Sequence, residues 1–491
     1  MLVIVSDLHL TDGTASPTLQ PAALELLTER IRDLAQRASW RADGVYRPLA
    51  HVDLVLLGDT LDCVDSARWL KSETRPWHDP HSPATVEVVC GIVDDILRHN
   101  SRSLSALRAL AAEGSVRLPT HSGYPGRAVE EQPVAVRIHY MVGNRDWLLH
   151  SPGADYDLLR RKIAHHLGLA APANNAWPHD PSESGELLEV LRRHRVVARH
   201  GDVFDPLSFS SHRDESSIGD ALLIDLLGRF QLALVHELAG EVPEAAVAGL
   251  ENMHHVRPLT AVPQWLASMV ARWCPAPALA AKMESLWNDL SDRLLDMPAV
   301  RDMASHNHLP IDDLRSALTL RTGPAADRNA ALVACRRLES RQGNYARHAL
   351  AEADFRNRRA RYIVYGHTHR AETVPLEASH ADAFVLNQLY FNAGTWRRVL
   401  HPTVHADGPT EFMPIEHFTC LAFYQGCERG GRPFETWSGT LSVPGGDGTV
   451  RRVDEPRQTV ASARTAPAAG SARPPHFTMP AASRSAAQAQ P

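Results

Sequence analysis

Polar side chains that can bind metal ions follow five separate apolar runs of this 491-residue chain. The runs are rich in Val, Ile, Leu or Tyr, as buried strands are. Loops at the carboxyl ends of strands converge in layered α/β folds, so these side chains are expected to share one site. The five clusters are Asp7-Leu8-His9, Gly58-Asp59, Gly143-Asn144-Arg145-Asp146, His200-Gly201-Asp202 and Gly366-His367-Thr368-His369.

The donors in these clusters form a mixed nitrogen and oxygen set without a thiolate, which suits Zn, Mn, Fe or Co better than Ca. Two ions about 3.5–4 Å apart can clamp a phosphoryl group and share one hydroxide. Asp59 follows a glycine, which lets the backbone turn closely beneath a metal, and it is the candidate for a bridging carboxylate. We therefore expect two divalent transition-metal ions and hydrolysis at phosphorus. The predicted metal ligands are Asp7, His9, Asp59, Asn144, His200, His367 and His369.

In this order, the blocks DLH, GD, GNRD, HGD and GHTH resemble the five signature blocks of the calcineurin-like metallophosphoesterase superfamily. The resemblance covers roughly residues 1–205 and 355–400. It implies a double β-sandwich flanked by helices, and attack on a phosphoester or pyrophosphate bond by a metal-bridging hydroxide. Carried over by position, one ion takes Asp7, His9, Asp59 and His369, and the other takes Asp59, Asn144, His200 and His367.

Arg145 stands where many members of the superfamily have a histidine that helps to protonate the leaving group. An arginine cannot give up a proton at working pH, but it can hold phosphate oxygens with forked hydrogen bonds. The loss of an acid matters less when the leaving group is itself a phosphate, so Arg145 favours an anhydride or activated ester as substrate. GNRD together with HGD also resembles the branch that contains UDP-2,3-diacylglucosamine hydrolases, the pyrophosphatases of lipid A synthesis.

The predicted catalytic residues are Asp59, Asn144, Arg145 and His200. Asp146 and Asp202 are expected to orient ligands by accepting hydrogen bonds, with loop capping as the alternative, and the same choice applies to Asp205. Residues 392–396 are expected to form a wall of the substrate site or a plain turn. The pairs His165-His166 and His254-His255 are assigned to the surface or the core.

The predicted fold class is α/β, with strands at residues 2–5, 52–57, 134–142, 195–199, 361–365 and 388–392 and helices at 21–38 and 86–113. Residues 217–354 have helical spacing and few strand-like runs. We therefore predict a metallophosphoesterase core in two parts, 1–210 and 355–454, around a helical insertion at 211–354. The apolar stretch 221–238 is expected to pack in the core of this insertion. Residues 455–491 consist mainly of Ala, Ser, Pro, Arg and Gln and are expected to be a disordered tail.

We expect a cytoplasmic protein whose partner is a small-molecule phosphoester or pyrophosphate substrate. The net charge of −6 argues against a nucleic-acid partner. The six cysteines are scattered, as in a reducing compartment, and no run is long enough for a signal peptide or a transmembrane segment. The helical insertion is the candidate contact for a partner protein or a lipid.

Two other functions are open to this sequence. A non-catalytic scaffold on the same fold would bind a partner through the insertion, and the loss of metal ligands would be its sign. Within enzymes, the alternatives are a protein phosphatase and a nuclease, and a nuclease should have a basic groove.

Overall fold

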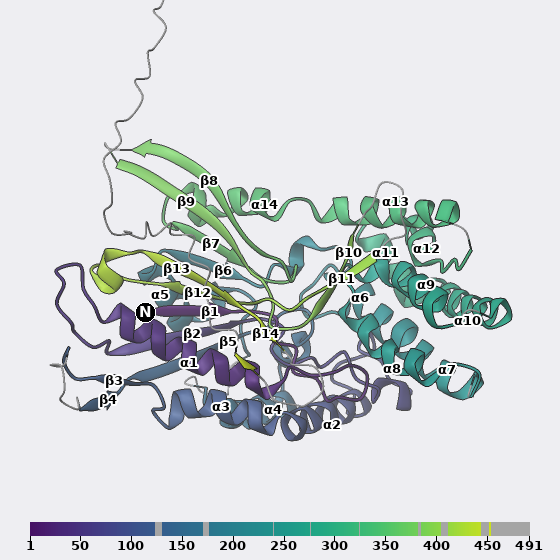
Figure 1. Cartoon of the computed structure of the whole chain (residues 1–491), viewed down its shortest axis with the longest axis horizontal. Coiled ribbons are helices and arrows are strands. Elements are labelled where there is room, and N and C mark those ends of the chain that lie inside the picture. The colour runs from purple at the N-terminus through teal and green to yellow at the C-terminus, as the bar shows by residue number, and fades with distance from the viewer. Residues whose placement is uncertain are drawn as a thin grey trace, which may run out of the picture. The chain divides into compact units, whose positions relative to one another are not determined.

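The computed structural model describes residues 1–122, 130–169, 176–238, 240–274, 276–323, 325–381, 384–403, 411–442 and 451–452. Met1–Val453 forms one compact unit. Its fold is α/β, with mixed sheets and many helices (Figure 1). The tail predicted at residues 455–491 lies outside the described residues, and the proposed division of the remaining chain stays a prediction.

Two mixed sheets carry the predicted ligands. The first has the strand order β13-β12-β1-β2-β5, in which β1, β2 and β5 are parallel; the second has the order β6-β7-β9-β8, in which β6, β7 and β9 are parallel. The strands of the first sheet are β1 (Leu2–Val5), β2 (His51–Leu57), β5 (Ala135–Met141), β12 (Phe418–Phe423) and β13 (Phe434–Gly439). Those of the second are β6 (Val196–Arg199), β7 (Tyr362–Tyr365), β8 (Ala371–Ala381) and β9 (Phe384–Ala393).

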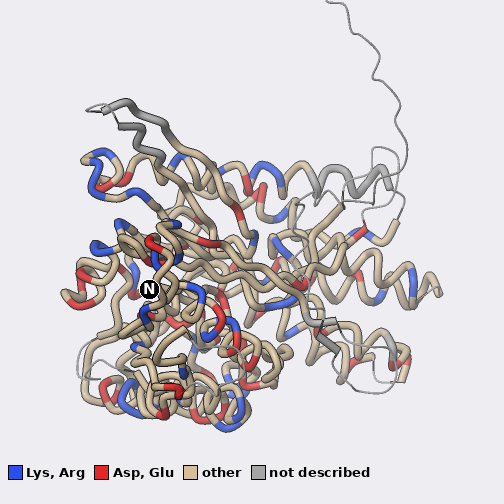
Figure 2. The backbone as a smooth tube through the Cα atoms, turned by 60° about the vertical axis from the view of Figure 1, so that its left-hand side comes forward, with Lys and Arg blue, Asp and Glu red and all other residues tan. Residues whose placement is uncertain are grey.

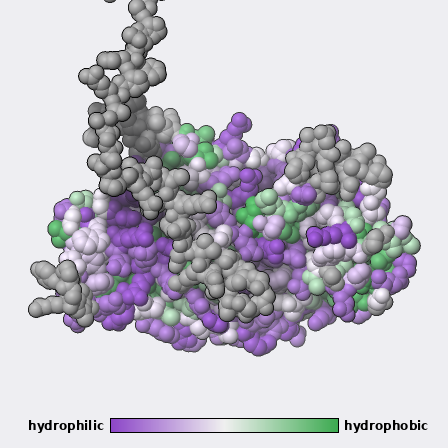
Figure 3. Space-filling view, in the orientation of Figure 1, coloured by the Kyte–Doolittle hydropathy of each residue, from purple (hydrophilic) through white to green (hydrophobic). Residues whose placement is uncertain are grey.

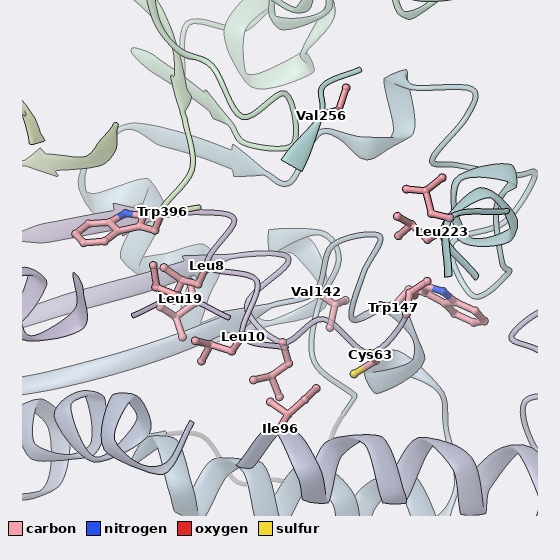
Figure 4. Packing of buried hydrophobic residues seen from close by; sticks show 14 of the residues in the cluster. Leu8, Leu10, Leu19, Cys63, Ile96, Val142, Trp147, Leu223, Val256 and Trp396 are labelled. Atoms are coloured by element: carbon pink, nitrogen blue, oxygen red, sulfur yellow. The ribbon is translucent and has the colours of Figure 1, made fainter. Parts of the chain in front are cut away.

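The parallel strands of the first sheet are buried on both faces, because successive side chains of a strand point to opposite sides. Val3 and Val5 pack in the core toward the helices, and Leu2 and Ile4 in a second core shared with the other sheet. Phe391 of the second sheet lies in that same shared core. The core on the helix side continues from the sheet to Leu223 and Val256 (Figure 4). Both residues belong to the chain between β6 and β7, which we call the helical segment.

Helices cover the outer faces of both sheets (Figure 1). Against the first sheet pack α1 (Pro21–Ala38), α2 (Pro83–His99), α3 (Ser101–Ala112) and α4 (Ala154–Leu167); α5 (Gly185–Arg193) contributes to the core between the sheets. Against the second pack α14 (Tyr345–Ala351) and α15 (Ala353–Arg356).

The predicted single helix 86–113 is wrong, because the structure has two helices with Asn100 between them. The Asn100 side-chain amide donates to the carbonyls of Thr11 and Ile96, and its oxygen accepts from the Thr18 hydroxyl. These bonds hold Asn100 outside helical geometry, at φ −100° and ψ 21°. A tertiary contact therefore overrides the helical spacing of the sequence.

The described elements between β6 and β7 are all helical. Their main helices are α6 (Ile218–Ala221), a π-helix (Leu222–Gly228), α7 (Arg229–Glu237), α8 (Glu244–Leu250), α9 (Val262–Trp273), α10 (Pro277–Asp296), α11 (Pro298–His306), α12 (Ile311–Leu318) and α13 (Ala325–Gln342), followed by α14 and α15. Every residue of the π-helix is buried, so this part of the apolar stretch packs in the core. Helices α7 to α12 gather at one end of the two sheets (Figure 1).

Smaller elements complete the described chain. They are β3 (Arg117–Pro119) paired with β4 (Glu131–Pro133), β10 (Val399–Thr403) paired with β11 (Glu411–Ile415), and β14 (Leu441–Ser442) paired with β15 (Arg451–Arg452).

Candidate metal centre

The predicted ligands follow the carboxyl ends of the parallel strands in both sheets. Asp7 and His9 follow β1, Asp59 follows β2, and Asn144 follows β5. From the second sheet, His200 follows β6, while His367 and His369 follow β7. The structure brings all seven together, although Asp7 and His369 lie 362 positions apart in the chain.

Five of the seven have a left-handed backbone conformation. The φ angles are 56° at Asp7, 46° at His9, 51° at Asp59, 67° at His367 and 59° at His369. Such a conformation is unfavourable for a residue with a side chain and is found mainly where function requires it. Its concentration at these positions makes the loops a candidate functional site on backbone geometry alone.

Three glycines next to the ligands allow the loops to approach one another. A Cβ atom on Gly143 would lie 2.4 Å from Asp59 Oδ1 and 2.7 Å from His200 Nε2. One on Gly58 would lie 2.5 Å from His200 Nδ1, and one on Gly366 would lie 2.8 Å from Asp7 Oδ2. The glycines of the GD, GNRD and GHTH motifs are thus part of the packing of the site.

The first group of donors consists of Asp7, His9 and His369. Nε2 of His9 lies 3.6 Å from Asp7 Oδ1 and 3.2 Å from His369 Nε2, and His369 Nε2 lies 3.3 Å from the same Asp7 oxygen. All three side chains are buried. Their ligand atoms therefore surround one point, as three ligands of one cation do.

The second group consists of Asn144, His200 and His367. Asn144 Oδ1 lies 3.2 Å from His200 Nε2 and 3.0 Å from His367 Nδ1. Asp59 lies between the two groups, with its Oδ2 atom 3.7 Å from His9 Nε2 and 3.4 Å from His200 Nε2. This is the position that a bridging carboxylate requires.

Hydrogen bonds from outside the two groups fix the orientation of three imidazoles. His9 Nδ1 donates to Asp62 (2.9 Å), His200 Nδ1 donates to the carbonyl of Leu57 (2.9 Å), and His367 Nε2 donates to Asp205 (3.0 Å). A carbonyl oxygen or an ionised carboxylate can only accept a hydrogen bond. Each of the three named nitrogens therefore carries a proton. When these imidazoles are neutral, the other ring nitrogen carries the lone pair and faces the donor groups.

The residues present fit a pair of metal ions. Nε2 of His200 and Nδ1 of His367 face the oxygen of Asn144 at 3.2 and 3.0 Å, so each contact needs either a proton on the ring nitrogen or a cation between the two atoms. Asp7 Oδ1 is buried without a hydrogen-bond partner. Burial would raise the pKa of Asp7 and Asp59, but the nearby histidines hold the pKa of both carboxyls below the usual range. Against the effect of burial, the same carboxylates raise the pKa of His9 and His200, and a divalent cation bound here would take the place of protons on these rings.

Arg145 enters the site from the loop after β5. Its backbone N–H donates to Asp59 Oδ1 (2.8 Å), and its buried guanidinium lies 3.7 Å from Asp220 Oδ1 of α6. Nη1 has no hydrogen-bond partner. Asp220 is held by a capping box with Ser217, so the helical segment contributes directly to the placement of Arg145.

Asp146 and Asp202 have different surroundings from each other. Asp146 accepts from the backbone of Thr60 and Gly143 and from the Tyr140 hydroxyl, so it joins the loop after β2 to the loop after β5. Burial and the charge of Asp59 raise the pKa of Asp146 to about 7. The Asp202 carboxylate lies 4.0 Å from the Arg213 guanidinium. It does not orient His200, because Nδ1 of that ring donates to the carbonyl of Leu57.

Residues 392–396 brace the loop after β1. The Thr395 hydroxyl and the Trp396 N–H both donate to the carbonyl of Asp7, and the Asn392 amide donates to the carbonyl of Gly366. These residues are buried behind the ligands and are absent from the lining of the cavity beside them. The segment is a support for the ligand loops rather than a wall of that cavity.

Sequence reasoning missed Asp62 and Asp220, and it did not place Asp205 on His367. Asp62 lies three residues after Asp59, and Asp220 stands in a Ser-x-x-Asp capping pattern, but neither spacing reveals the partner. Of the two positions left open for His254-His255, surface or core, the structure has the core, because both are buried. His254 Nδ1 lies 2.9 Å from Asp65, and His255 accepts from Arg397.

A cavity of about 870 Å³ opens beside the two groups of donors. Asp59, Asn144, His367 and His369 lie at its inner end. Its remaining wall comes mostly from the helical segment, including α9, α13 and the residues around Pro258. A substrate larger than one phosphoryl group therefore has room next to the candidate metal centre.

No protein-family model matches the chain, and no curated protein is similar enough to count as a match. Among the described residues, no helix is both long and apolar enough to cross a membrane. The coloured part of the face in Figure 3 is mainly hydrophilic, with smaller apolar areas.

Proposed function

We propose that the chain is a dinuclear metal-dependent phosphohydrolase of the calcineurin-like metallophosphoesterase type. The observation that carries the proposal is the arrangement of seven donor side chains in two groups joined by Asp59. Ring nitrogens of His200 and His367 face an amide oxygen there, and neutral imidazoles with these tautomers would be stable in this arrangement with a cation between them and the oxygen. The order of the motifs and the two mixed sheets with a shared core support the same type of fold.

In this proposal, Asp7, His9, Asp59 and His369 hold one ion, and Asp59, Asn144, His200 and His367 hold the other. When bound, two such ions neutralise charge on a phosphoryl group and make a hydroxide available near neutral pH. The tautomers set by Asp62, Leu57 and Asp205 keep the ring nitrogens available for binding.

Arg145 binds and orients the phosphoryl group. Its Nη1 lies 3.7 Å from Asp220 Oδ1 but has no hydrogen-bond partner, and Arg145 lines the cavity with Asp59 and Asn144. Because burial is opposed by the charges of Asp62 and Asp220, the pKa of Arg145 is raised, and the group stays a cation. It stabilises charge without donating a proton, which favours a leaving group of low pKa such as a phosphate.

The test is metal-dependent hydrolysis by the full chain. Bis-p-nitrophenyl phosphate, p-nitrophenyl phosphate and a nucleotide-sugar pyrophosphate are compared with Mn, Zn and Mg. We expect turnover that needs metal and a preference for the anhydride. Efficient turnover of simple alkyl phosphomonoesters would count against the role given to Arg145, and a scaffold would hydrolyse none of these compounds.

Asp59→Ala should abolish both activity and metal occupancy while the chain stays folded, because Asp59 contributes to both groups of donors. Bound metal is measured by elemental analysis and folding by circular dichroism. Asp292→Ala, at an exposed position of α10, is the control and should keep both properties. Retention of turnover by Asp59→Ala would refute the bridging role.

A further inference from the structure

The cavity beside the candidate metal centre contains four arginines in addition to Arg145. They come from the loop before α9, from α13, from α14 and from the loop after β7. Two carboxylates, Glu339 and Glu372, share this part of the wall. No carboxylate of the described residues lies within ion-pair distance of any of the four, which are Arg257, Arg336, Arg347 and Arg370.

Arg257 is the innermost of the four. Its Nη1 atom donates to the carbonyls of His254 and Val256, both at 2.9 Å. Burial lowers its pKa to about 9, with further repulsion from Arg397 and Arg145. A half-buried cation beside other cations is unfavourable unless an anion compensates for it.

Arg397 provides a contrast within the same region. It is buried, but its guanidinium lies 3.6 Å from Asp65 and 3.9 Å from Asp62, so protein carboxylates balance its charge. Arg257 faces the cavity and has no such partner among the described residues. The natural counter-charge of Arg257 is therefore a bound anion.

The other three arginines extend this positive wall outward. Arg336, Arg347 and Arg370 are exposed and line the same cavity. Elsewhere in the described chain, basic and acidic residues are interspersed (Figure 2). The excess of arginine is thus a local property of the cavity and not of the whole protein, whose net charge is −6.

We propose that this cavity binds a polyanionic chain, with at least two phosphate groups beyond the one at the metal centre. The proposal rests on the proposed function, because the metal centre defines which phosphate is attacked. Arg145 and Arg257 bind the part of the substrate nearest the reacting phosphorus, and Arg336, Arg347 and Arg370 bind the distal phosphates. Arginine suits this task because its planar fork matches two phosphate oxygens.

An acyl chain fits the same cavity poorly. It would displace water from the four guanidiniums without offering them a counter-ion, which is costly. The wall also includes apolar residues, such as Leu207, Leu222 and Ile415, but they share it with these charged groups. The substrate expected from the cavity is therefore a phosphate chain and not a lipid.

The test is calorimetric binding of inorganic tripolyphosphate and orthophosphate to the full chain in a buffer free of divalent cations. We expect tripolyphosphate to bind at least about tenfold more tightly than orthophosphate, since more charge-assisted hydrogen bonds form. Arg257→Gln should weaken tripolyphosphate binding by about tenfold, and the triple change of Arg336, Arg347 and Arg370 to Gln by about tenfold or more.

A second triple variant changes Arg98, Arg102 and Arg272 to Gln. These arginines are exposed and lie outside the cavity, so the net charge falls equally, and binding should stay within about twofold. Melting temperatures check that Arg257→Gln is folded. If that variant is unfolded, the triple change of the exposed residues Arg336, Arg347 and Arg370 still tests the proposal.

Equal affinity for the two anions, or equal weakening by both triple variants, would overturn the proposal. Hydrolysis of bis-p-nitrophenyl phosphate is measured separately. Arginine-dependent binding without any metal-stimulated hydrolysis would refute the proposed function alone. Hydrolysis without arginine-dependent binding of tripolyphosphate would refute the polyanion cavity alone.

Discussion

Single residues around the ligands set how closely the loops can approach. Gly143 is the clearest case, because the space of a Cβ atom there is already filled by Asp59 and His200. The adjacent Asn144 is a predicted ligand, so the loop cannot move away without carrying a donor with it. The glycine in the GNRD block is thus explained by a steric requirement.

We expect Gly143→Ala to lose bound metal and at least about 100-fold in hydrolysis, since a displacement of about 1 Å in a catalytic group has effects of this size. Metal content and kcat/KM are the measurements. Gly185→Ala is the control, because a Cβ atom there meets nothing within 4 Å. Equal metal content in the Gly143 variant and the control would contradict the steric role.

A second prediction at this scale concerns Asp62, which accepts the Nδ1 proton of His9. Asp62→Ala should lower metal affinity by about 10- to 100-fold, the usual effect of removing a carboxylate that orients a histidine ligand. Affinity is measured by competition with a chelator of known strength. Asp43→Ala removes an exposed carboxylate and should have no effect. An unchanged affinity in Asp62→Ala would show that the tautomer of His9 is set elsewhere.

Among the secondary-structure elements, α5 offers a site where stability responds to pH. His194 follows the last residue of α5, is 5% exposed, and donates from Nδ1 to the carbonyl of Val190 (2.9 Å). Burial lowers its pKa to about 4, although the hydrogen bond to Val190 partly opposes this. The folded protein therefore resists protonation of this ring.

The sign of the effect follows from the two pKa values. The unfolded chain binds more protons between the folded value of about 4 and the ordinary value of about 6.5. The stability from neutral His194 is thus present above pH 6.5 or so and is lost as the pH falls toward 4, by at most about 3 kcal/mol.

His194→Asn should flatten the dependence of unfolding free energy on pH in this window, as measured by urea denaturation at about pH 5 and about pH 7.5. The exposed His165→Asn is the control and should keep the wild-type slope. An unaltered slope in His194→Asn would assign the pH dependence to other groups.

At the scale of the whole molecule, the site depends on how the two sheets are packed. Asp7, Asp59 and Asn144 come from the loops of one sheet, and His200 and His367 from the loops of the other. The shared core therefore fixes the distance between the two sets of ligands. Its aromatic centre includes Phe391, whose ring centroid lies 5.8 Å from that of Phe423 and 5.1 Å from that of Phe434.

Phe391→Ala should lower the free energy of unfolding by about 3–5 kcal/mol, because it leaves a cavity between the sheets. Metal affinity should fall as well, since the ligand loops lose their common support. Both are measured on the purified full chain, with Phe391→Leu expected to show a smaller loss in each. A normal metal affinity in a destabilised Phe391→Ala would separate the site from the sheet packing.

The sequence by itself determined the donor types, their order and the strands that carry them. Four-residue runs such as Leu2–Val5 and the polar cluster after each are local patterns, and both sheets have their parallel strands where these runs lie. The α/β class follows from the same patterns. A strand buried on both faces has a continuous apolar sequence, which is visible without any tertiary information.

Only the tertiary structure decided which groups face each other. Asp62 meets His9 across 53 positions, Asp205 meets His367 across 162, and Arg257 enters the cavity from the helical segment. Asn100 ends a helix because it reaches the carbonyl of Thr11. Such contacts join residues whose spacing follows no helical or strand period, so they depend on how the sheets and helices pack and leave no local pattern in the sequence.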